Sequence, residues 1–383
     1  MINGAHPRTR MIHYRTEVGD AQPAVTPLFQ SSAFGVGSPY FYTRKNNPNI
    51  AEFEEAVCIM EGAAHGVALS TGMAAIKVCL DLVRPGQTIL LSGLLYGCTV
   101  KLVKRHCERY GIRLALRDLS VKDFQLDAEE DVAMAFFETP TNPFLRTIDI
   151  AAVAARVKAR CPNALVIVDN TWATPVFQRP LECGADISLH SATKYLSGHS
   201  DVMGGVVLTN DAELAELIRQ ERFYSGMVMD PFAAWLLRRS LNTIYVRLEE
   251  QGKTTERMVA YLRTLPKVAE VYYPHIDGTQ LTGYGGIIFV QLREESGESF
   301  SKIVSNLSCF GSGTGMACVS SMIAQPYTGS HASMDDAEKE AMGLNRGLIR
   351  FCFGLERPED LMADLESVLG PSSTRQLETA SRV

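Results

Sequence analysis

Short apolar segments alternate with amphipathic segments between residues 50 and 225, and this alternation limits the folds open to the chain. Predicted strands cover residues 66–69, 88–91, 114–116, 134–137, 165–168, 187–189 and 205–208. Predicted helices between them include residues 73–83 and 99–110. This order is typical of an α/β fold with a mostly parallel, doubly wound sheet, which binds ligands at the carboxyl ends of its strands.

The chain has 383 residues, too many for one small core, and its character changes along its length. We expect an arm over residues 1–45, a ligand-binding domain over residues 46–230, a smaller C-terminal α+β domain over residues 231–370 and a polar tail over residues 371–383. Within the C-terminal domain we expect a long helical stretch over residues 231–265, strands over residues 286–290 and 348–351, and a final helix over residues 358–369.

Composition argues against several classes of protein. A net charge of -6 gives no sign of a surface for nucleic acid or anionic membranes. No apolar run approaches the roughly 18 residues of a membrane span, and the N-terminus lacks an apolar signal core. The nine cysteines are scattered, without metal-ligand spacing, as expected of reduced thiols. We therefore expect a cytoplasmic protein with no metal, nucleic-acid or membrane partner.

Lys194 is the most informative single residue for chemistry. It lies among small hydroxyl residues and glycines, which suits an amine that forms a Schiff base beside a bound phosphate. Upstream, Asp169 ends the apolar strand over residues 165–168, where a carboxylate can keep a pyridine nitrogen protonated. Together the two residues predict pyridoxal 5'-phosphate (PLP) as the cofactor. Asp169 could instead cap the following helix.

Several groups could bind the cofactor's phosphate. Gly72 and Met73 open a helix directly after a strand, and the free backbone N–H groups of a helix start attract anions. The alternative is an ordinary strand-to-helix turn. Ser191 and Thr193 could add hydroxyl donors or be plain loop residues. Arg44, in the arm, could form a two-bond fork with phosphate or be solvated.

Other residues could contact the cofactor ring or the substrate. Tyr96 follows a strand and could stack on the ring, or it could be a core or interface tyrosine. Asn142, in a loop fixed by two prolines, could bind the ring's phenolic oxygen, or the loop could bind no ligand. Arg350, amid apolar neighbours, suits a clamp on an α-carboxylate or a structural ion pair. Cys98 could lie near the substrate or fill space.

Seven motifs follow one another along the chain: Tyr42-Thr43-Arg44 with Asn47-Pro48, Ser70-Thr71-Gly72-Met73, Tyr96-Gly97-Cys98-Thr99, Thr141-Asn142-Pro143, Val168-Asp169-Asn170-Thr171, His190-Ser191-Ala192-Thr193-Lys194-Tyr195 and Ile349-Arg350. In this combination and order they resemble the Cys/Met-metabolism family of PLP enzymes, which includes cystathionine γ-synthase, cystathionine γ-lyase, methionine γ-lyase and O-acetylhomoserine sulfhydrylase. The resemblance covers residues 20–370. It implies PLP-dependent transferase fold type I, like that of aspartate aminotransferase. It also implies a homotetramer, a dimer of dimers with active sites at the dimer interface.

The resemblance also implies a role for each residue. Lys194 would carry the Schiff base, Asp169 would pair with the ring nitrogen, and Tyr96 would stack on the ring and assist departure of the leaving group. Arg350 would bind the substrate carboxylate. The phosphate would be held by Gly72, Met73, Ser191 and Thr193, and Tyr42 and Arg44 would reach the phosphate of the neighbouring subunit's cofactor.

The substrate side departs from the family pattern. Gly315 stands where the family has a serine near the substrate, Ser320 where it has a glutamate, and the segment after Pro274 is shortened. Cys98 matches the methionine γ-lyase motif, but the Lys-Asp pair that accompanies it there is Arg222-Phe223 here.

We therefore expect γ- or β-elimination on an L-amino acid of the Cys, Met or homoserine type, near Arg350, Asn142, Cys98 and Gly315. Thiol, thioether, acyl-oxy and halide leaving groups all fit. The alternatives are γ-replacement, another PLP reaction such as transamination or cysteine desulfuration, and a non-catalytic PLP-binding regulator.

Overall fold

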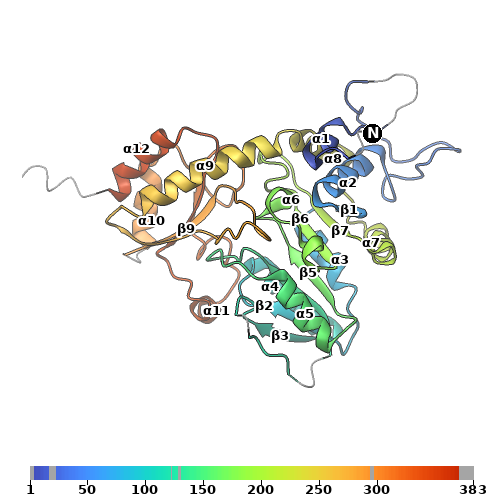
Figure 1. The fold of residues 1–383 in the computed structure, drawn as a ribbon, viewed down its shortest axis with the longest axis horizontal. Helices are drawn as coiled ribbons and strands as arrows, with labels where there is room; N and C mark the ends of the chain where they lie inside the picture. The colour runs from blue at the N-terminus through green and yellow to red at the C-terminus, as the bar shows by residue number, and fades with distance from the viewer. Residues whose placement is uncertain (1–3, 17–22, 122, 128–130, 294–296, 371–383) are drawn as a thin grey trace, which may run out of the picture. The chain divides into compact units, whose positions relative to one another are not determined.

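The computed structural model describes residues 4–16, 23–121, 123–127, 131–293 and 297–370 (Figure 1). The chain divides into two units, and the predicted tail over residues 371–383 lies outside the described residues. The first unit comprises Met1–Leu248 and Pro274–Tyr284, and the second comprises Glu249–Tyr273 and Gly285–Val383. No helix in the described part of the chain has the length and apolar character needed to cross a membrane.

A seven-stranded sheet forms the centre of the first unit, in the order β1-β7-β6-β5-β4-β2-β3. Every pairing is parallel except those of β7, which runs antiparallel between β1 and β6. All seven predicted strands are present. Their bounds are β1 (His65–Leu69), β2 (Thr88–Ser92), β3 (Arg113–Arg117), β4 (Val132–Glu138), β5 (Leu165–Asp169), β6 (Ile187–Ser191) and β7 (Gly205–Thr209).

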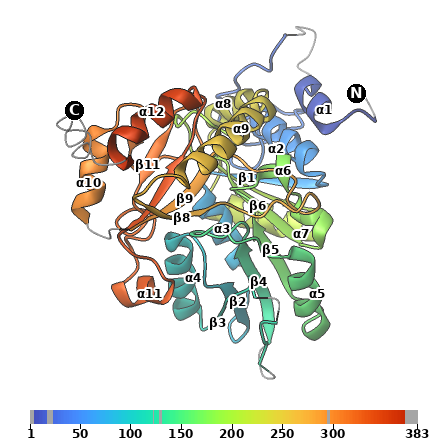
Figure 2. The same ribbon diagram turned by 60° about the vertical axis from the view of Figure 1, so that its left-hand side comes forward.

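Helices cover both faces of this sheet, which confirms the doubly wound α/β fold (Figure 2). On one face Ile167 of β5 packs with α3 (Gly72–Leu80), α4 (Gly97–Tyr110) and α7 (Ala212–Ser225). On the other face Val166 and Val168 pack with α5 (Ile150–Arg160). Because both faces are buried, the central strands are apolar at nearly every position. The polar residues then come where the strands end.

The arm contains a helix that the sequence did not predict, α1 (Pro7–His13). Seven residues are too few for a stable helix in isolation. Tertiary contacts explain it, because Arg238 of α8 (Pro231–Leu241) donates hydrogen bonds to the carbonyl oxygens of Met11, at 2.9 Å, and Tyr14, at 3.0 Å. The first unit also contains α2 (Pro48–Glu61), the short α6 (Thr174–Phe177) and a 3-10 turn over Pro180–Cys183.

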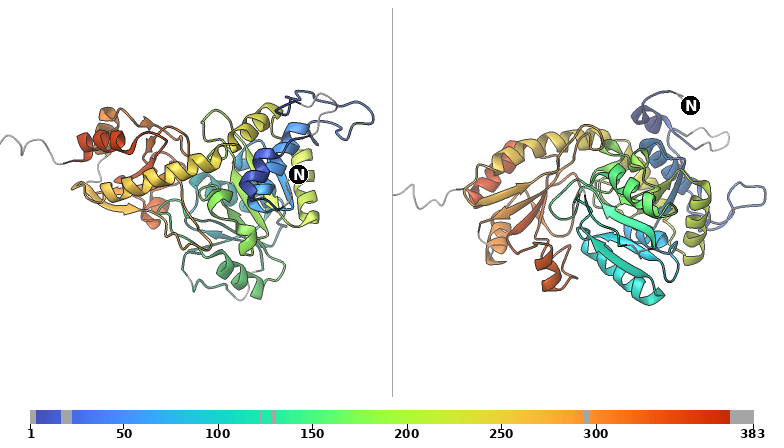
Figure 3. Two further views of the ribbon diagram at one scale, coloured as in Figure 1. Left: turned by 45° about the horizontal axis from the view of Figure 1, so that its top comes forward. Right: turned by 60° about the horizontal axis from the view of Figure 1, so that its bottom comes forward.

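The second unit is an α+β arrangement around a five-stranded sheet of order β10-β11-β12-β9-β8. Its helices α9 and α12 lie side by side, joined by an ion pair of 2.6 Å between Arg257 and Glu359 (Figure 3). The bounds are α9 (Ile244–Leu262), β8 (Val268–Tyr272), β9 (Ile287–Leu292), α10 (Gly297–Asn306), β10 (Gly311–Ser312), β11 (Met322–Ala324), α11 (Asp336–Ala341), β12 (Leu348–Cys352) and α12 (Pro358–Leu369).

The long helical stretch predicted over residues 231–265 is two helices, α8 and α9. The break lies at Asn242 and Thr243. The Thr243 hydroxyl donates to the Ser240 carbonyl oxygen at 3.2 Å, and the Asn242 side chain accepts from Arg238 at 2.8 Å. Short polar side chains of this kind compete with the helical backbone pattern.

Candidate active site

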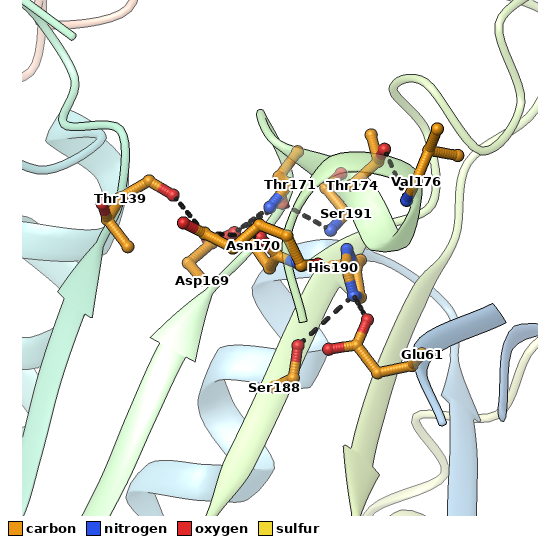
Figure 4. Close-up of polar contacts among 11 residues, drawn as sticks. Glu61, Thr139, Asp169, Asn170, Thr171, Thr174, Val176, Ser188, His190 and Ser191 are labelled. Atoms are coloured by element: carbon orange, nitrogen blue, oxygen red, sulfur yellow. Dashed lines mark hydrogen bonds and ion pairs between the residues drawn. The ribbon is translucent and has the colours of Figure 1, made fainter. Parts of the chain in front are cut away.

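Functional side chains of the first unit gather at the carboxyl ends of neighbouring strands. Asp169 ends β5, Ser191 ends β6, and Glu138 ends β4. The strand register places Glu138 directly beside Asp169, and Asp169 beside Leu189 of β6. Figure 4 shows Asp169, Thr171, His190 and Ser191 close together at this edge. The sheet therefore brings together residues that lie far apart in the sequence.

Asp169 is held from one side. The Thr171 backbone N–H and hydroxyl donate to its Oδ1, at 3.0 and 2.5 Å. Both hydrogen bonds end on Oδ1, and no hydrogen bond from the described residues reaches Oδ2, which is thus available to a ligand. Burial raises the pKa of the Asp169 carboxyl, against the lowering effect of these hydrogen bonds and of nearby His190. Asp169 thus accepts from Thr171 two residues on and does not cap a helix in the described chain.

His190 lies beneath this edge and forms a buried pair with Glu61 at the end of α2. The His190 Nε2 atom lies 3.1 Å from Glu61 Oε2, and both side chains are almost completely shielded from solvent (Figure 4). The pair connects α2 to the strand that leads into the Lys194 loop. His190 also lies close enough to Asp169 to lower the pKa of its carboxyl.

The Lys194 loop is closed by short backbone hydrogen bonds. The Lys194 N–H donates to the Ser191 carbonyl at 3.2 Å, and the Lys194 carbonyl accepts from the Gly198 N–H at 2.7 Å. Thr193 is tied to Gly204, whose N–H donates to the Thr193 hydroxyl at 3.0 Å. Lys194 itself is partly exposed. The loop thus holds the backbone of Lys194 in one place while its side chain keeps access to solvent.

Three strand ends meet tightly where α3 begins. Thr71 caps α3, because its hydroxyl accepts from the Ala74 N–H at 3.0 Å. A Cβ on Gly72 would lie 2.8 Å from the Ser191 Cβ, and one on Gly205 would lie 2.2 Å from the Thr71 carbonyl oxygen. Only glycine permits this approach. The start of α3, with Gly72 and Met73, therefore lies directly beside Ser191 and forms a cradle for an anion.

The cradle also depends on a residue that the sequence did not single out. Gly205 opens β7 and pairs with both Leu69 of β1 and Ser191 of β6. A glycine at the start of an apolar strand is the only local signal, and it does not reveal which strands lie on either side. The role of Gly205 follows from the strand order.

Tyr96 and Asn142 lie on loops that follow β2 and β4. Tyr96 is the residue before α4, and its N–H donates to Glu138 Oε2 at 3.2 Å. Cys98 is the second residue of α4 and is partly exposed. Asn142 is buried, and its side-chain oxygen has no hydrogen-bond partner among the described residues. A buried amide with an unused polar atom is suited to a polar ligand.

The arm is fastened by Arg222 and Phe223, the pair that departs from the family pattern. Arg44 donates to the Phe223 carbonyl oxygen at 3.0 Å, and its guanidinium lies 4.3 Å from the Phe223 ring centroid. The same guanidinium lies 5.5 Å from the ring of Tyr42. Buried Arg222 forms an ion pair of 2.6 Å with Glu54 and donates to the Lys45 carbonyl oxygen at 2.9 Å. Arg44 is thus held against α7, and the exposed Tyr42 lies beside its guanidinium.

Two of the predicted substrate residues lie in the second unit and contact each other. Arg350, in β12, is buried and donates to the Gly315 carbonyl oxygen at 3.0 Å. The contact uses the backbone of Gly315, so it does not need the serine that the family has there. Ala317 has a positive φ of 62°, and its N–H donates to the Cys352 sulfur at 2.8 Å. The altered segment is therefore fixed to the strand that carries Arg350.

The residues of the first unit fit PLP as a group. The cradle at Gly72 suits a phosphate, Asp169 Oδ2 suits a protonated ring nitrogen, and the unused polar atom of Asn142 suits a ring substituent. Lys194 lies three residues after Ser191 of the cradle, and its side chain would supply the amine. The unit thus combines a site for the phosphate anion, a carboxylate for the ring nitrogen cation and a lysine amine, which is the combination that this cofactor requires.

Comparison with known proteins agrees with this fit. The Cys/Met metabolism PLP-dependent enzyme family matches residues 8–370. A cystathionine beta-lyase of Lactococcus lactis subsp. cremoris is 37% identical over 377 residues, which span 94% of this chain and 98% of that protein. An L-methionine gamma-lyase of Fusobacterium nucleatum is 33% identical, over 90% of this chain and 92% of that protein.

The fold agrees as well. The crystal structure of the cystathionine gamma lyase CalE6 from Micromonospora echinospora has a TM-score of 0.89 and 32% identity, and the match covers 96% of this chain and 99% of that chain. The predictions of fold type I, of PLP as cofactor and of a PLP-dependent enzyme are confirmed. The chain belongs to the Cys/Met-metabolism family of PLP-dependent enzymes.

Proposed function

We propose that the protein eliminates a substituent from the γ- or β-carbon of an L-amino acid of the Cys, Met or homoserine type. PLP-dependent elimination or replacement on such amino acids is the chemistry of its relatives. The observation that carries the proposal is the meeting of the Lys194 loop, Asp169 and the start of α4 at adjoining strand ends. The partly exposed Cys98 beside Tyr96, as in methionine γ-lyases, favours elimination over replacement.

Lys194 and Tyr96 would perform the proton transfers. The bound cofactor supplies an electron sink for the charge left when the substrate Cα loses its proton. The Lys194 amine would take that proton and, for γ-chemistry, would next move a proton from Cβ. The Tyr96 hydroxyl would donate a proton to the departing group. Asp169 would hold its negative charge against the ring nitrogen throughout, which keeps the sink effective.

The remaining residues would bind and orient. Gly72 and Met73 would offer backbone N–H groups to the phosphate, and Ser191 and Thr193 would offer hydroxyls. Asn142 would bind the phenolic oxygen of the cofactor ring and so hold that edge of the ring in place. In the second unit Arg350 would bind the substrate α-carboxylate, and its bond to the Gly315 carbonyl would hold the guanidinium in one plane. The small Gly315 suits a compact or apolar substrate side chain.

A homotetramer with active sites at subunit interfaces is also part of the proposal. Phe41, next to Tyr42, is 68% exposed, and Val36 is fully exposed. An arm with exposed apolar side chains, and with Arg44 held against Phe223, is suited to contact a neighbouring subunit. Tyr42 and Arg44 would then bind the phosphate of that subunit's cofactor. The nine cysteines are all free thiols, which supports a cytoplasmic location.

A panel of β- and γ-substituted amino acids tests the proposal. Purified protein with bound PLP is mixed with each compound, and 2-oxo acid, ammonia and the released group are quantified with and without an added thiol. Elimination predicts equal amounts of 2-oxo acid and released group, and Lys194→Ala abolishes both. Formation of a new thioether in place of 2-oxo acid would instead establish replacement. Conversion of the cofactor to its amine form would establish transamination.

A further inference from the structure

Glu138 is a buried acid that none of the roles above uses. It ends β4, is 1% exposed, and lies in register with Asp169 at the end of β5. Side chains that are paired in a parallel sheet point to the same face. Two carboxyl groups thus lie side by side at the edge where the cofactor would bind.

The two carboxyl groups are bonded differently. Asp169 receives two hydrogen bonds on Oδ1, both from Thr171. Glu138 accepts the Tyr96 N–H on Oε2 at 3.2 Å, and the Trp172 side chain also donates to it. Its other oxygen, Oε1, is buried and has no hydrogen-bond partner among the described residues. An ionised Glu138 would therefore have an unsolvated oxygen, which is costly.

One proton on Glu138 removes both difficulties. It cancels the charge on the unsolvated oxygen, and it removes the repulsion between two neighbouring anions. Asp169 is the better place for the remaining charge, because the Thr171 donors and nearby His190 favour its ionised form. In agreement, burial and the charge of Asp169 raise the pKa of Glu138 well above its ordinary value.

We propose that Glu138 is a neutral carboxylic acid. It holds the backbone of Tyr96 in place through the Tyr96 N–H, and it leaves Asp169 as the single negative charge facing the cofactor ring. Glu138 is thus a positioning residue, acting through Tyr96 and Asp169. The inference rests on the proposed function for the roles of Tyr96 and Asp169, while the neutrality of Glu138 can be measured by itself.

The proposal makes glutamine a close mimic of the native residue. Its amide oxygen would take the place of Oε2 and accept the Tyr96 N–H, and its NH₂ group would take the place of a protonated Oε1. Glu138→Gln therefore keeps the acceptor for the Tyr96 N–H and keeps residue 138 neutral beside the Asp169 anion. Glu138→Ala removes the acceptor for the Tyr96 N–H. Asp169→Asn removes the negative charge of residue 169 while keeping the shape of its side chain.

Infrared spectroscopy tests the neutral acid directly. The difference spectrum between the wild-type holoenzyme and Glu138→Gln, at neutral pH, is expected to show the carbonyl band of a protonated carboxylic acid. A difference spectrum with only carboxylate bands overturns the proposal. If the glutamine variant does not fold, Glu138→Ala supplies the same comparison. The band is also readable in protein without cofactor, so failure to bind PLP would overturn the proposed function and leave this test intact.

Two cofactor spectra test the positioning role. The pH midpoint of the visible absorbance is expected to stay within about 0.3 unit in Glu138→Gln and to move by about one unit or more in Asp169→Asn. The visible circular dichroism, which reports the setting of the ring, is expected to survive in Glu138→Gln and to weaken in Glu138→Ala. A shifted midpoint in Glu138→Gln, or unchanged dichroism in Glu138→Ala, contradicts the proposal.

Discussion

Thr171 binds Asp169 twice at the same carboxylate oxygen, with its backbone N–H 3.0 Å and its hydroxyl 2.5 Å from Oδ1. The Thr171 hydroxyl also accepts the backbone N–H of Ser191 at 2.9 Å. One side chain thus orients the acid at the end of β5 and joins it to the strand end that leads to Lys194. Because both bonds end on Oδ1, Oδ2 is available to a ligand at the edge.

Replacing Thr171 with valine tests this link. Valine keeps the shape of the side chain but removes a hydrogen bond to a charged group, worth about 1.5–3 kcal/mol. We expect the dissociation constant for PLP to rise about 10-fold or more, measured by titrating the cofactor-free protein. Thr147→Val is the control, because within the described part of the chain the Thr147 hydroxyl donates to a single exposed carbonyl oxygen, that of His275. Equal effects of the two substitutions would contradict the role of Thr171.

Phe223 is expected to set the position of Arg44. Phe223→Leu keeps the backbone carbonyl that accepts from Arg44 but removes the ring beneath the guanidinium. A cation–π contact of about 0.5–2 kcal/mol predicts a dissociation constant for PLP about 3- to 30-fold higher. The neighbouring Tyr224→Leu, at a residue that is 78% exposed, is expected to leave the constant unchanged. If Phe223→Leu binds PLP as tightly as Tyr224→Leu, the position of Arg44 against the Phe223 ring does not contribute to phosphate binding.

The stability of the cofactor-free protein should depend on pH through Glu138. Its pKa is raised in the folded state, so the folded protein keeps a proton that the unfolded chain has lost. The unfolded state then binds fewer protons, and the free energy of unfolding falls as the pH rises above the ordinary value of 4.5 toward the folded-state pKa. Urea unfolding at a series of pH values should give a flatter profile for Glu138→Gln than for wild type. Identical profiles would mean that Glu138 ionises normally in the folded protein.

Much of the fold follows from local sequence. Strands such as β5 could be predicted because four apolar residues precede a polar one, and parallel strands bring such ends to one edge. Asp169 could be singled out for the same reason, and Lys194 and Ser191 because they lie in a run of small hydroxyl residues and glycines. The pairing of Glu138 with Asp169 could not, because it depends on the β4–β5 register. The role of Gly205 depends on β7 lying between β1 and β6.

Tertiary contacts explain the other differences. The α1 helix forms because Arg238, more than 200 positions away in sequence, binds its carbonyl end. The use of Arg222 and Phe223 to fasten the arm likewise depends on α7 meeting residues 44 and 45. No local sequence pattern predicts either contact.

The most direct test of the account is to map where PLP is attached. The protein is reconstituted with PLP, the link is reduced with borohydride, and the digested peptides are sequenced by mass spectrometry. We predict a pyridoxyl group on Lys194, in the peptide that contains Ser191 and Thr193, and no stable visible absorbance in Lys194→Ala. A label on any other lysine, or a protein that takes up no PLP, would contradict it.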